Sequence, residues 1–165
     1  HHLCFNDTYL STFDTNYKVS PPFRTEKDRK ALIAGVKEGT IDAIVSAHEP
    51  QDEESKKLEF DLAEFGITGL QTLWPVLNQL DIKGELSLEQ SLPAVFAGPR
   101  KVLGLEPVAL EVGADACLTV VDTSAKWTFD KKTNLSKSIN NPFFGKELTG
   151  MVAAVSNNGL VQTTN

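Results

Sequence analysis

The stretch "IDAIVSAHEPQDEE", residues 41–54, begins with an apolar run and continues into an acidic loop. The run predicts a buried strand that ends at Ser46. In α/β enzymes the catalytic side chains gather at the carboxyl ends of such strands. Here the tip of the strand carries Ala47, followed by His48 and Glu49. The stretch therefore predicts an α/β fold, with an alanine where a base or a metal ligand is expected.

The residues before this strand predict a helix. Thr25 is suited to cap its first turn, with the acidic Asp28 three residues on, as in a capping box. Gly39 stands where helices commonly end in a glycine. The apolar residues between them recur at helical spacing: Ala31, Leu32, Ile33 and Val36. A helix followed at once by a strand is the step from which α/β folds are built.

Further elements are predicted on both sides of this step. Residues 69–80 are apolar on most sides and predict a buried helix that Pro75 either kinks or begins. Ser87 and Gln90 form a second capping box, and the helix after it carries Leu92, Val95 and Phe96 on one face. The shorter predicted elements are a strand at residues 2–5, a helix over residues 58–65 that Gly66 ends, and a last turn that Pro99 restarts.

The pattern becomes that of β-structure near residue 105. "DACLTVVD", residues 115–122, predicts a strand, and Trp127 and Phe129 continue the alternation. "MVAAVSNNGLVQ", residues 151–162, predicts a hairpin with Asn158 and Gly159 in its turn. We therefore divide the chain into residues 1–104 and residues 105–165.

The composition limits the partners. With 41% hydrophobic and 23% charged residues, the 165-residue chain is typical of globular proteins. The net charge of −6 gives no support for nucleic acid or an anionic membrane as a partner. No apolar run approaches the roughly 20 residues that span a bilayer. Cys4 and Cys117 are far apart in the sequence, which favours buried free thiols over a disulfide, in a reducing cytoplasm.

The chain starts with His1 and His2, which could be the remnant of a purification tag. They continue directly into an apolar segment with no linker, so we interpret them as native sequence. No secretory signal follows them, and there is no initiator methionine. We therefore expect the chain to be a fragment.

Five stretches resemble the dihydroorotases of the cyclic amidohydrolase superfamily, in the family's order and over nearly the whole chain. They are "HHLCFND", "YKVSPPFRTEKDRKALIAGVKEGTIDAIVSAHEPQ", "FGITGLQT", "EVGADACLTVVD" and "SKSINNPFFGKELTGMV". The resemblance implies the C-terminal portion of a TIM-type (β/α)8 barrel, strands seven and eight with their helices, followed by part of a small β-sandwich. The other strands would lie in the missing N-terminal part of the same protein.

The resemblance also implies an activity, the reversible ring closure of N-carbamoyl-L-aspartate to dihydroorotate in pyrimidine biosynthesis. The family uses one or two zinc ions, which polarise the amide and activate a bridging water. Most of the metal ligands come from barrel strands one, four, five and six, which we expect to be absent here. The one ligand expected in this chain is the aspartate of Ser/Thr-Asp-His-x-Pro-His, which also acts as general acid/base.

This sequence departs from the family's pattern at three positions. The aspartate is replaced by Ala47, the final histidine by Gln51, and the asparagine of Asn-Pro-Pro-Leu-Arg by Ser20. Phe65 and Gly66 match a pair that contacts substrate largely through its backbone. A methyl group cannot accept a proton or bind zinc, and general acid/base catalysis contributes about 10²–10⁴-fold. We therefore expect no intact catalytic residue and no metal ligand in this chain, with Ser20, Gln51, Phe65 and Gly66 at the substrate positions.

Several other side chains have both a functional and a structural interpretation. Glu49 could replace the lost aspartate only if the strand's alternation continues into the loop. His48 is more typical of a hydrogen-bonded structural residue than of a metal ligand. Arg24 favours a salt bridge over a substrate carboxylate, and Trp74 and Trp127 favour the core over stacking platforms.

Two hypotheses about function remain. The first is a non-catalytic dihydroorotase homologue that acts as a scaffold or partner of aspartate carbamoyltransferase, as some family members with broken sites do. The second is a working zinc dihydroorotase in which another residue replaces the aspartate and the missing part of the protein supplies the rest. Three losses at one site favour the first. We also expect a cytoplasmic homo-oligomer.

Overall fold

Helix α1, Glu26–Lys37, forms where the sequence predicts it. The capping box is present, since the Thr25 hydroxyl accepts from the Asp28 amide at 3.4 Å and the Asp28 carboxylate accepts from the Thr25 amide at 3.1 Å. Gly39, with φ of +74°, follows the last turn as predicted. Ile33 and Val36 are buried, so the helix packs its apolar stripe inward. The computed structural model describes residues 1–164.

The predicted strand over residues 41–46 is wrong, because this segment is extended but joins no ladder. The Ile44 amide donates at 2.8 Å to the carbonyl of Ala94, a residue that lies in a helix. The segment contacts a neighbour in strand fashion only beyond its end, at a single parallel bridge between His48 and Ile67. The predicted strand at residues 2–5 is also wrong, because a turn in which the amides of Cys4 and Phe5 both donate to the His1 carbonyl occupies its place.

The remaining helices are partly as predicted. Helix α3, Leu73–Ile82, has Pro75 in its first turn and buries much of its surface, which confirms the prediction for residues 69–80. The capping box of Ser87 and Gln90 is confirmed at the start of α4, Leu88–Ser91. Helix α5, Pro93–Val102, runs through Pro99 instead of restarting there, and Phe96 is exposed.

No helix forms over residues 58–65, so that prediction is wrong. The helical turn lies earlier, in α2, Glu53–Lys56, where Asp52 accepts from the Ser55 amide at 2.7 Å. The apolar residues that suggested a helix point largely to solvent: Leu58, Leu62 and Phe65. With no buried face to stabilise it, the segment adopts turns.

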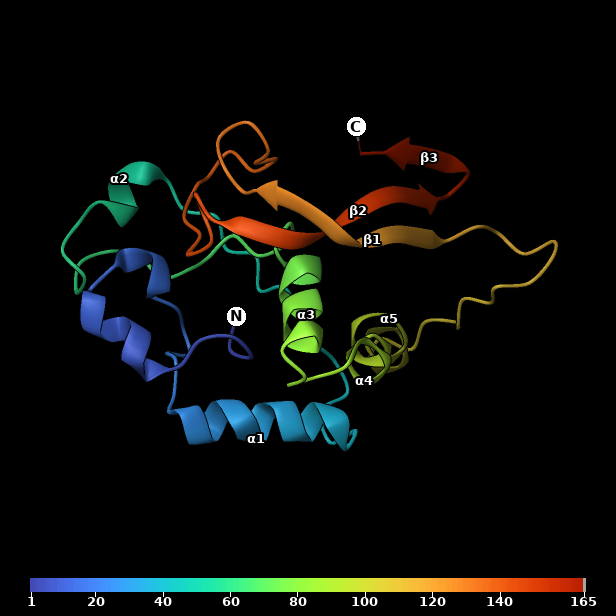
Figure 1. Ribbon diagram of the computed structural model, residues 1–165, viewed down its shortest axis with the longest axis horizontal. Helices are drawn as coiled ribbons and strands as arrows, with labels where there is room; N and C mark the ends of the chain where they lie inside the picture. Colours follow the sequence, from blue (N-terminus) through green and yellow to red (C-terminus); the bar gives the residue numbers. More distant parts are fainter. Residues whose placement is uncertain (165) are drawn as a thin grey trace.

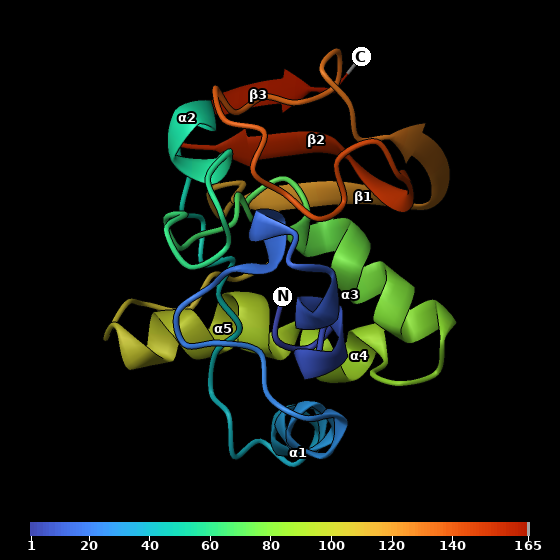
Figure 2. The ribbon, with the colours of Figure 1, turned by 90° about the vertical axis from the view of Figure 1, so that its left-hand side faces the viewer.

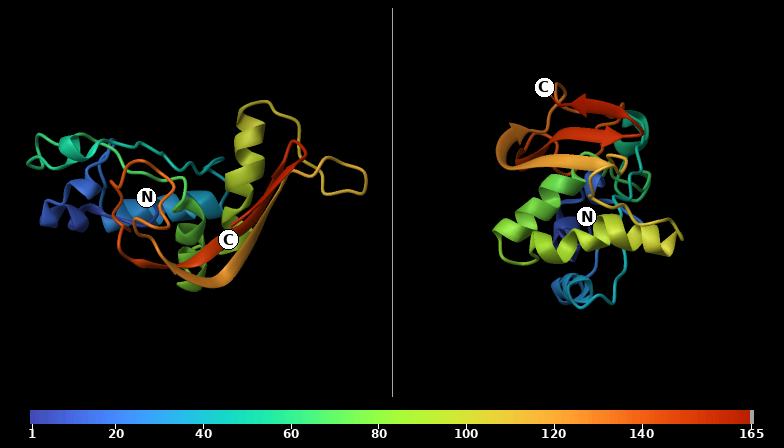
Figure 3. Two further views of the ribbon diagram at one scale, coloured as in Figure 1. Left: turned by 90° about the horizontal axis from the view of Figure 1, so that it is seen from above. Right: turned by 90° about the vertical axis from the view of Figure 1, so that its right-hand side faces the viewer.

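Three strands form an antiparallel sheet in the order β1–β2–β3. They are β1, Leu118–Thr128, β2, Glu147–Asn157, and β3, Leu160–Thr163. The turn between β2 and β3 has Asn158 and Gly159 at φ of +49° and +74°, which confirms the predicted hairpin. The register of β1 on β2 shifts between Asp122 and Lys126. Both strands curve strongly when seen from above (Figure 3).

The sheet lies along one side of the molecule and α1 along the opposite side, with α3 between them (Figures 1 and 2). Two clusters of buried residues fill the interior. One is largely aromatic: Phe5, Tyr17, Val19, Phe23, Ile67, Val76, Phe129, Phe143 and Leu148. The other is aliphatic: Ile33, Val36, Leu77, Leu80, Leu86 and Ala94. The aromatic cluster therefore unites residues from both sides of residue 105.

Residues of the first part reach the sheet through polar contacts as well. The Asn78 side chain, which is 1% exposed, donates to the carbonyls of Thr123 and Thr149, both at 3.0 Å. Trp127 donates to the Gly150 carbonyl at 2.9 Å and packs against the aromatic cluster, as predicted for a core residue. Cys4 is partly buried, whereas Cys117 is exposed, contrary to prediction.

None of the helices within residues 1–164 combines the length and the apolar character that a membrane crossing requires.

Candidate functional site

Ala47 lines a mostly apolar cavity of about 200 Å³ between the 43–47 segment, α1 and α3. Its backbone has φ of +43°, in the left-handed region that non-glycine residues rarely adopt. The extended backbone of residues 41–46 therefore turns sharply at the position of the expected aspartate. This turn decides where the next side chains point.

His48 is bonded to the backbone and is not placed to bind a ligand. Its Nδ1 accepts hydrogen bonds from the backbone amides of Gly69 at 3.0 Å and Leu70 at 3.4 Å. An imidazole that accepts at Nδ1 carries its proton on Nε2 when neutral. The predicted structural role of His48 is thus confirmed. The backbone of Gly69 also lies very close to that of Ser46, because a Cβ on Gly69 would lie 2.1 Å from the Ser46 carbonyl oxygen.

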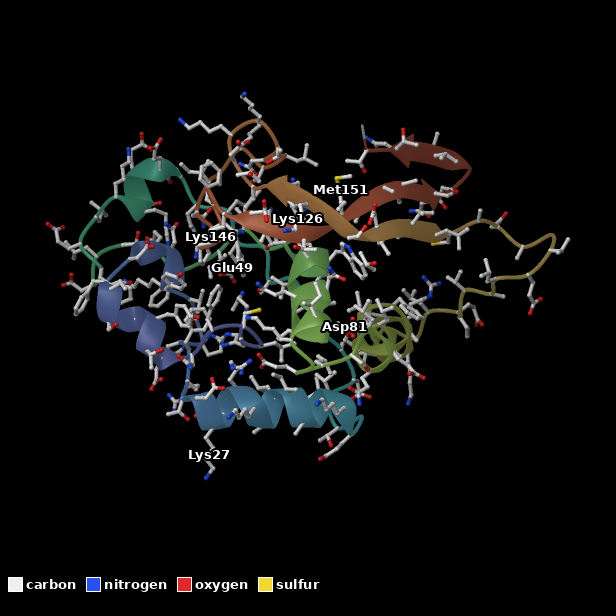
Figure 4. The ribbon with its side chains drawn as sticks, in the orientation of Figure 1. Lys27, Glu49, Asp81, Lys126, Lys146 and Met151 are labelled. Carbon is white, nitrogen blue, oxygen red and sulfur yellow. The ribbon has the colours of Figure 1, made fainter. Side chains whose placement is uncertain are left out.

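Glu49 does not take the place of the missing aspartate. Its side chain lies beside Gly66, where a Cβ would come 3.2 Å from the Glu49 Oε2 atom, and it is not among the residues lining the Ala47 cavity. Figure 4 labels Glu49 in the region between α2 and α3. The left-handed backbone at Ala47 breaks the alternation that would have brought the two side chains to one side.

The predicted substrate positions fall into two groups. Gln51 donates from Nε2 to the Phe65 carbonyl at 2.8 Å, so Gln51, Phe65 and Gly66 lie together. None of these three lines the Ala47 cavity, and Gln51 instead lines a larger, open cavity of about 1060 Å³. Ser20 is exposed and lines neither. Arg24 is exposed, and no salt bridge to it is found within residues 1–164, contrary to prediction.

Sequence reasoning missed the two histidines at the same cavity as Ala47. His1 and His2 both line it, with ring centroids 4.5 Å apart, and both rings contact the edge or face of Phe23. Burial lowers the pKa of His2, which favours the neutral imidazole that can bind a metal. The available signal was a pair of histidines leading directly into an apolar segment.

The donor set around Ala47 does not make a zinc site by itself. A structural or catalytic zinc needs three or four nitrogen, sulfur or oxygen ligands from the protein. Of the side chains that commonly bind zinc, those lining the cavity are the two imidazoles, and no cluster of three or more His, Cys, Asp or Glu suited to a metal occurs in the described part of the chain. The zinc that the family resemblance implies therefore does not fit the described residues alone.

Two buried lysines lie beside the Phe65–Gly66 segment. Lys18 is 8% exposed, donates to the Asp61 carbonyl at 2.9 Å, and lies 4.7 Å from the centre of the Phe65 ring. Lys56 is 7% exposed and donates to the carbonyls of Glu64 and Gly66. Burial, with Lys18 nearby, lowers the pKa of Lys56 to about 8.

Comparison with known proteins identifies the relatives of this chain. The dihydroorotase of Bacillus subtilis is 42% identical over 155 residues, which are 93% of this chain and 36% of that protein. The dihydroorotase of Elusimicrobium minutum is 40% identical over 153 residues, 92% of this chain and 35% of that protein. This chain is a relative of the dihydroorotases. The resemblance inferred from the five stretches is confirmed, and the chain spans little more than a third of these relatives. No protein-family model matches it.

Solved structures agree on the fold. The L-hydantoinase (dihydropyrimidinase) from Arthrobacter aurescens has a TM-score of 0.84 at 26% identity, over 99% of this chain and 39% of that protein. The D-hydantoinase (dihydropyrimidinase) from a Thermus species has a TM-score of 0.79 at 27% identity, again over 99% and 39%. This α/β chain thus matches a partial region of amidohydrolase TIM-barrel enzymes.

Proposed function

We propose that this chain is part of a non-catalytic dihydroorotase-like protein of pyrimidine biosynthesis, which acts as a scaffold or partner of aspartate carbamoyltransferase. The observation that carries the proposal is the methyl group of Ala47 in the wall of the cavity, at the position of the family's aspartate. We place the protein in the cytoplasm as a homo-oligomer, completed by its missing N-terminal part.

The chemistry of ring closure explains why Ala47 matters. The attacking amide must lose a proton, and the leaving oxygen must gain one, so a carboxylate held at this position would act in both steps. A bound zinc would supply a Lewis acid, but its ligands are incomplete among the described residues. His48 cannot compensate, because its Nδ1 is committed to Gly69, and Glu49 lies outside the cavity.

The geometry of Gln51 supports the same proposal. The family's histidine at this position contacts substrate, whereas the Gln51 amide donates to the Phe65 carbonyl. A side chain that is bonded to the backbone of a neighbouring loop is not free to orient a ligand unless that bond breaks. Two of the three altered positions, Ala47 and Gln51, thus support the proposal, whereas Ser20 is exposed.

The second candidate is an active zinc dihydroorotase in which the missing part of the protein supplies the other ligands. The observation that favours it is the pair of imidazoles, His1 and His2, lining the cavity with Ala47. With two nitrogen ligands already present, a metal could be held if carboxylates or histidines from elsewhere reach this cavity.

The experiment that separates the two uses the full-length protein. Its zinc content is measured after dialysis, and carbamoyl-aspartate cyclisation is assayed at mildly acidic pH with added zinc. We expect no turnover, and we expect complex formation with aspartate carbamoyltransferase in sedimentation at micromolar concentrations. Near-stoichiometric zinc together with cyclisation would refute the scaffold proposal, and the absence of any complex would remove its partner.

A further inference from the structure

The carbonyl of Gly66 receives hydrogen bonds from two side chains that belong to other segments of the chain. Lys56 Nζ, from α2, donates to it at 3.2 Å, and Asn140 Nδ2, from the segment before β2, donates to it at 3.1 Å. The Gly66 amide is also engaged, because it donates to the Lys18 carbonyl at 2.9 Å. The backbone of Gly66 is therefore fully committed to partners within this chain.

The position of Gly66 leaves no room for a side chain. Its φ is +126°, and a Cβ would come 2.8 Å from both the Cβ and the carbonyl oxygen of Glu49. A backbone this close to its neighbour moves only if the loops around it move as well. Whatever fixes the Gly66 carbonyl also fixes the distance between the Phe65–Gly66 segment and the loop that follows Ala47.

Asn140 connects these two loops directly. Its Nδ2 donates to the Glu49 carbonyl at 3.0 Å as well as to Gly66, and its Oδ1 accepts from the Gln51 amide at 3.3 Å. Its own carbonyl accepts from the Thr68 amide at 3.0 Å. The side chain is 3% exposed, so water does not replace these bonds when they are lost.

Lys56 brings an ammonium group to the same carbonyl. No carboxylate in the described part of the chain forms a salt bridge with it, and its bonds go to the carbonyls of Glu64, at 2.8 Å, and Gly66. A buried charge without a counter-ion is costly unless its donors are satisfied. The loop carbonyls satisfy Lys56, so the position of the loop and the burial of Lys56 depend on each other.

We propose that Lys56 and Asn140 are positioning residues that together clamp the Gly66 carbonyl and so set the place of the Phe65–Gly66 segment against the loop after Ala47. The clamp rests on these contacts alone and does not depend on the proposed function. Opening of the segment releases Lys56 to solvent and breaks the Asn140 bridge.

The test measures hydrogen exchange of the Gly66 and Thr68 amides in the full-length protein, with the amides of α1 as the reference for global unfolding. Asn140→Leu removes the bridge without changing charge. We expect its protection factors at Gly66 and Thr68 to fall about tenfold, the equivalent of about one net hydrogen bond, with α1 unchanged. The matched control is Asn134→Leu, because Asn134 donates only to Ser136 and Ser138 within its own loop.

Lys56 is tested through the pH dependence of amide protection. A residue with a merely structural role would not give this one loop a pH dependence of its own. The charged groups that face it are Lys18, Asp14 and Glu64. Its pKa is lowered to about 8 in the closed loop and returns toward 10.5 on opening, so the closed state gains stability as pH rises from about 8. Protection of Gly66, corrected for intrinsic exchange, should therefore rise between pH 8 and 9.5 in the native protein.

Lys56→Met should abolish this rise, and Lys57→Met should keep it, because Lys57 directly follows α2 with its side chain 71% exposed. A flat pH profile in the native protein, or one that Lys56→Met leaves intact, overturns the role of Lys56. Equal loss of protection at Gly66 and in α1 on Asn140→Leu overturns the clamp in favour of a general contribution to stability. Should Asn140→Leu fail to fold, the pH profile of the native protein still decides. None of these readings requires catalysis, so they stand apart from the fate of the proposed function.

Discussion

Replacing Ala47 by glycine should stabilise the full-length protein. Ala47 has φ of +43°, and a left-handed backbone costs an L-residue about 1–2 kcal/mol. Glycine avoids that cost but gives up about 0.4–1 kcal/mol through the greater freedom of the unfolded chain. The difference predicts a gain of roughly 0.5–1 kcal/mol in the free energy of unfolding. Urea denaturation followed by circular dichroism measures it.

The control is Ala43→Gly, in the extended backbone just before, where no positive φ is present. There the same change should lower the free energy of unfolding by about 0.5–1 kcal/mol, the usual cost of glycine in ordered backbone. If Ala47→Gly also lowers stability, the backbone at Ala47 is not strained and the reasoning fails.

The left-handed backbone at Ala47 also leads to a prediction for Ala47→Asp. Asparagine and aspartate occupy the left-handed region several-fold more readily than alanine, so the substitution should be tolerated, within about 1 kcal/mol of the native free energy of unfolding. We nevertheless expect no recovery of carbamoyl-aspartate cyclisation, because groups that act as a unit are strongly non-additive. The triple change Ala47→Asp, Gln51→His, Ser20→Asn is the comparison. Turnover by the single variant within about tenfold of the enzyme median of about 10 s⁻¹ would show that the site is otherwise intact.

Three further predictions concern stability. Gly69→Ala should cost about 1–3 kcal/mol in urea denaturation, because its Cβ would lie 2.1 Å from the Ser46 carbonyl oxygen, and an unchanged midpoint would contradict this. Asn78→Leu should cost about 1–3 kcal/mol, since it leaves the carbonyls of Thr123 and Thr149 without this donor; the exposed Gln79→Leu is its control. The hydrogen bond from Arg29 lowers the pKa of Glu26 to about 2, so the stability it contributes is complete above pH 4.5 and is lost as pH falls toward 2. Glu26→Gln should flatten that part of the acid-unfolding curve, and an unchanged curve counts against the ion pair.

The predictable elements were those whose signals lie within a few residues of one another. A capping box, a C-terminal glycine and an Asn-Gly turn each act through local hydrogen bonds and dihedral preferences, and α1 and the β2–β3 hairpin formed accordingly. The strand at residues 41–46 failed because a strand exists only in a ladder. Its apolar pattern fixed an extended backbone but carried no information on whether a neighbour would pair with it.

The site was predictable only in part for a related reason. The missing carboxylate at Ala47 could be read directly, since it depends on the identity of one residue. The turn at Ala47 could not, and it carried Glu49 out of the cavity and directed His48 toward Gly69. Dihedral preferences alone favour the opposite outcome, because alanine seldom adopts positive φ.

The contacts that hold the Phe65–Gly66 segment in place cross the boundary at residue 105 that divides the chain by sequence. Asn140 lies 91 residues from Glu49 and 74 from Gly66 in sequence, yet its side chain joins both. The signal was present in the stretch "SKSINNPFFGKELTGMV", where two adjacent asparagines sit in an otherwise ordinary loop, and both are buried with their amides bonded to distant carbonyls. Buried amides are retained where they satisfy backbone groups that no ladder satisfies. Because the 65–68 backbone belongs to no strand, its carbonyls need donors from elsewhere. Asn140 and Asn141 donate to the carbonyls of Gly66 and Thr68, whereas donors from residues 49 and 51 reach those of Ile67 and Phe65. The loops that carry the altered family positions are therefore held in place by residues from both parts of the chain.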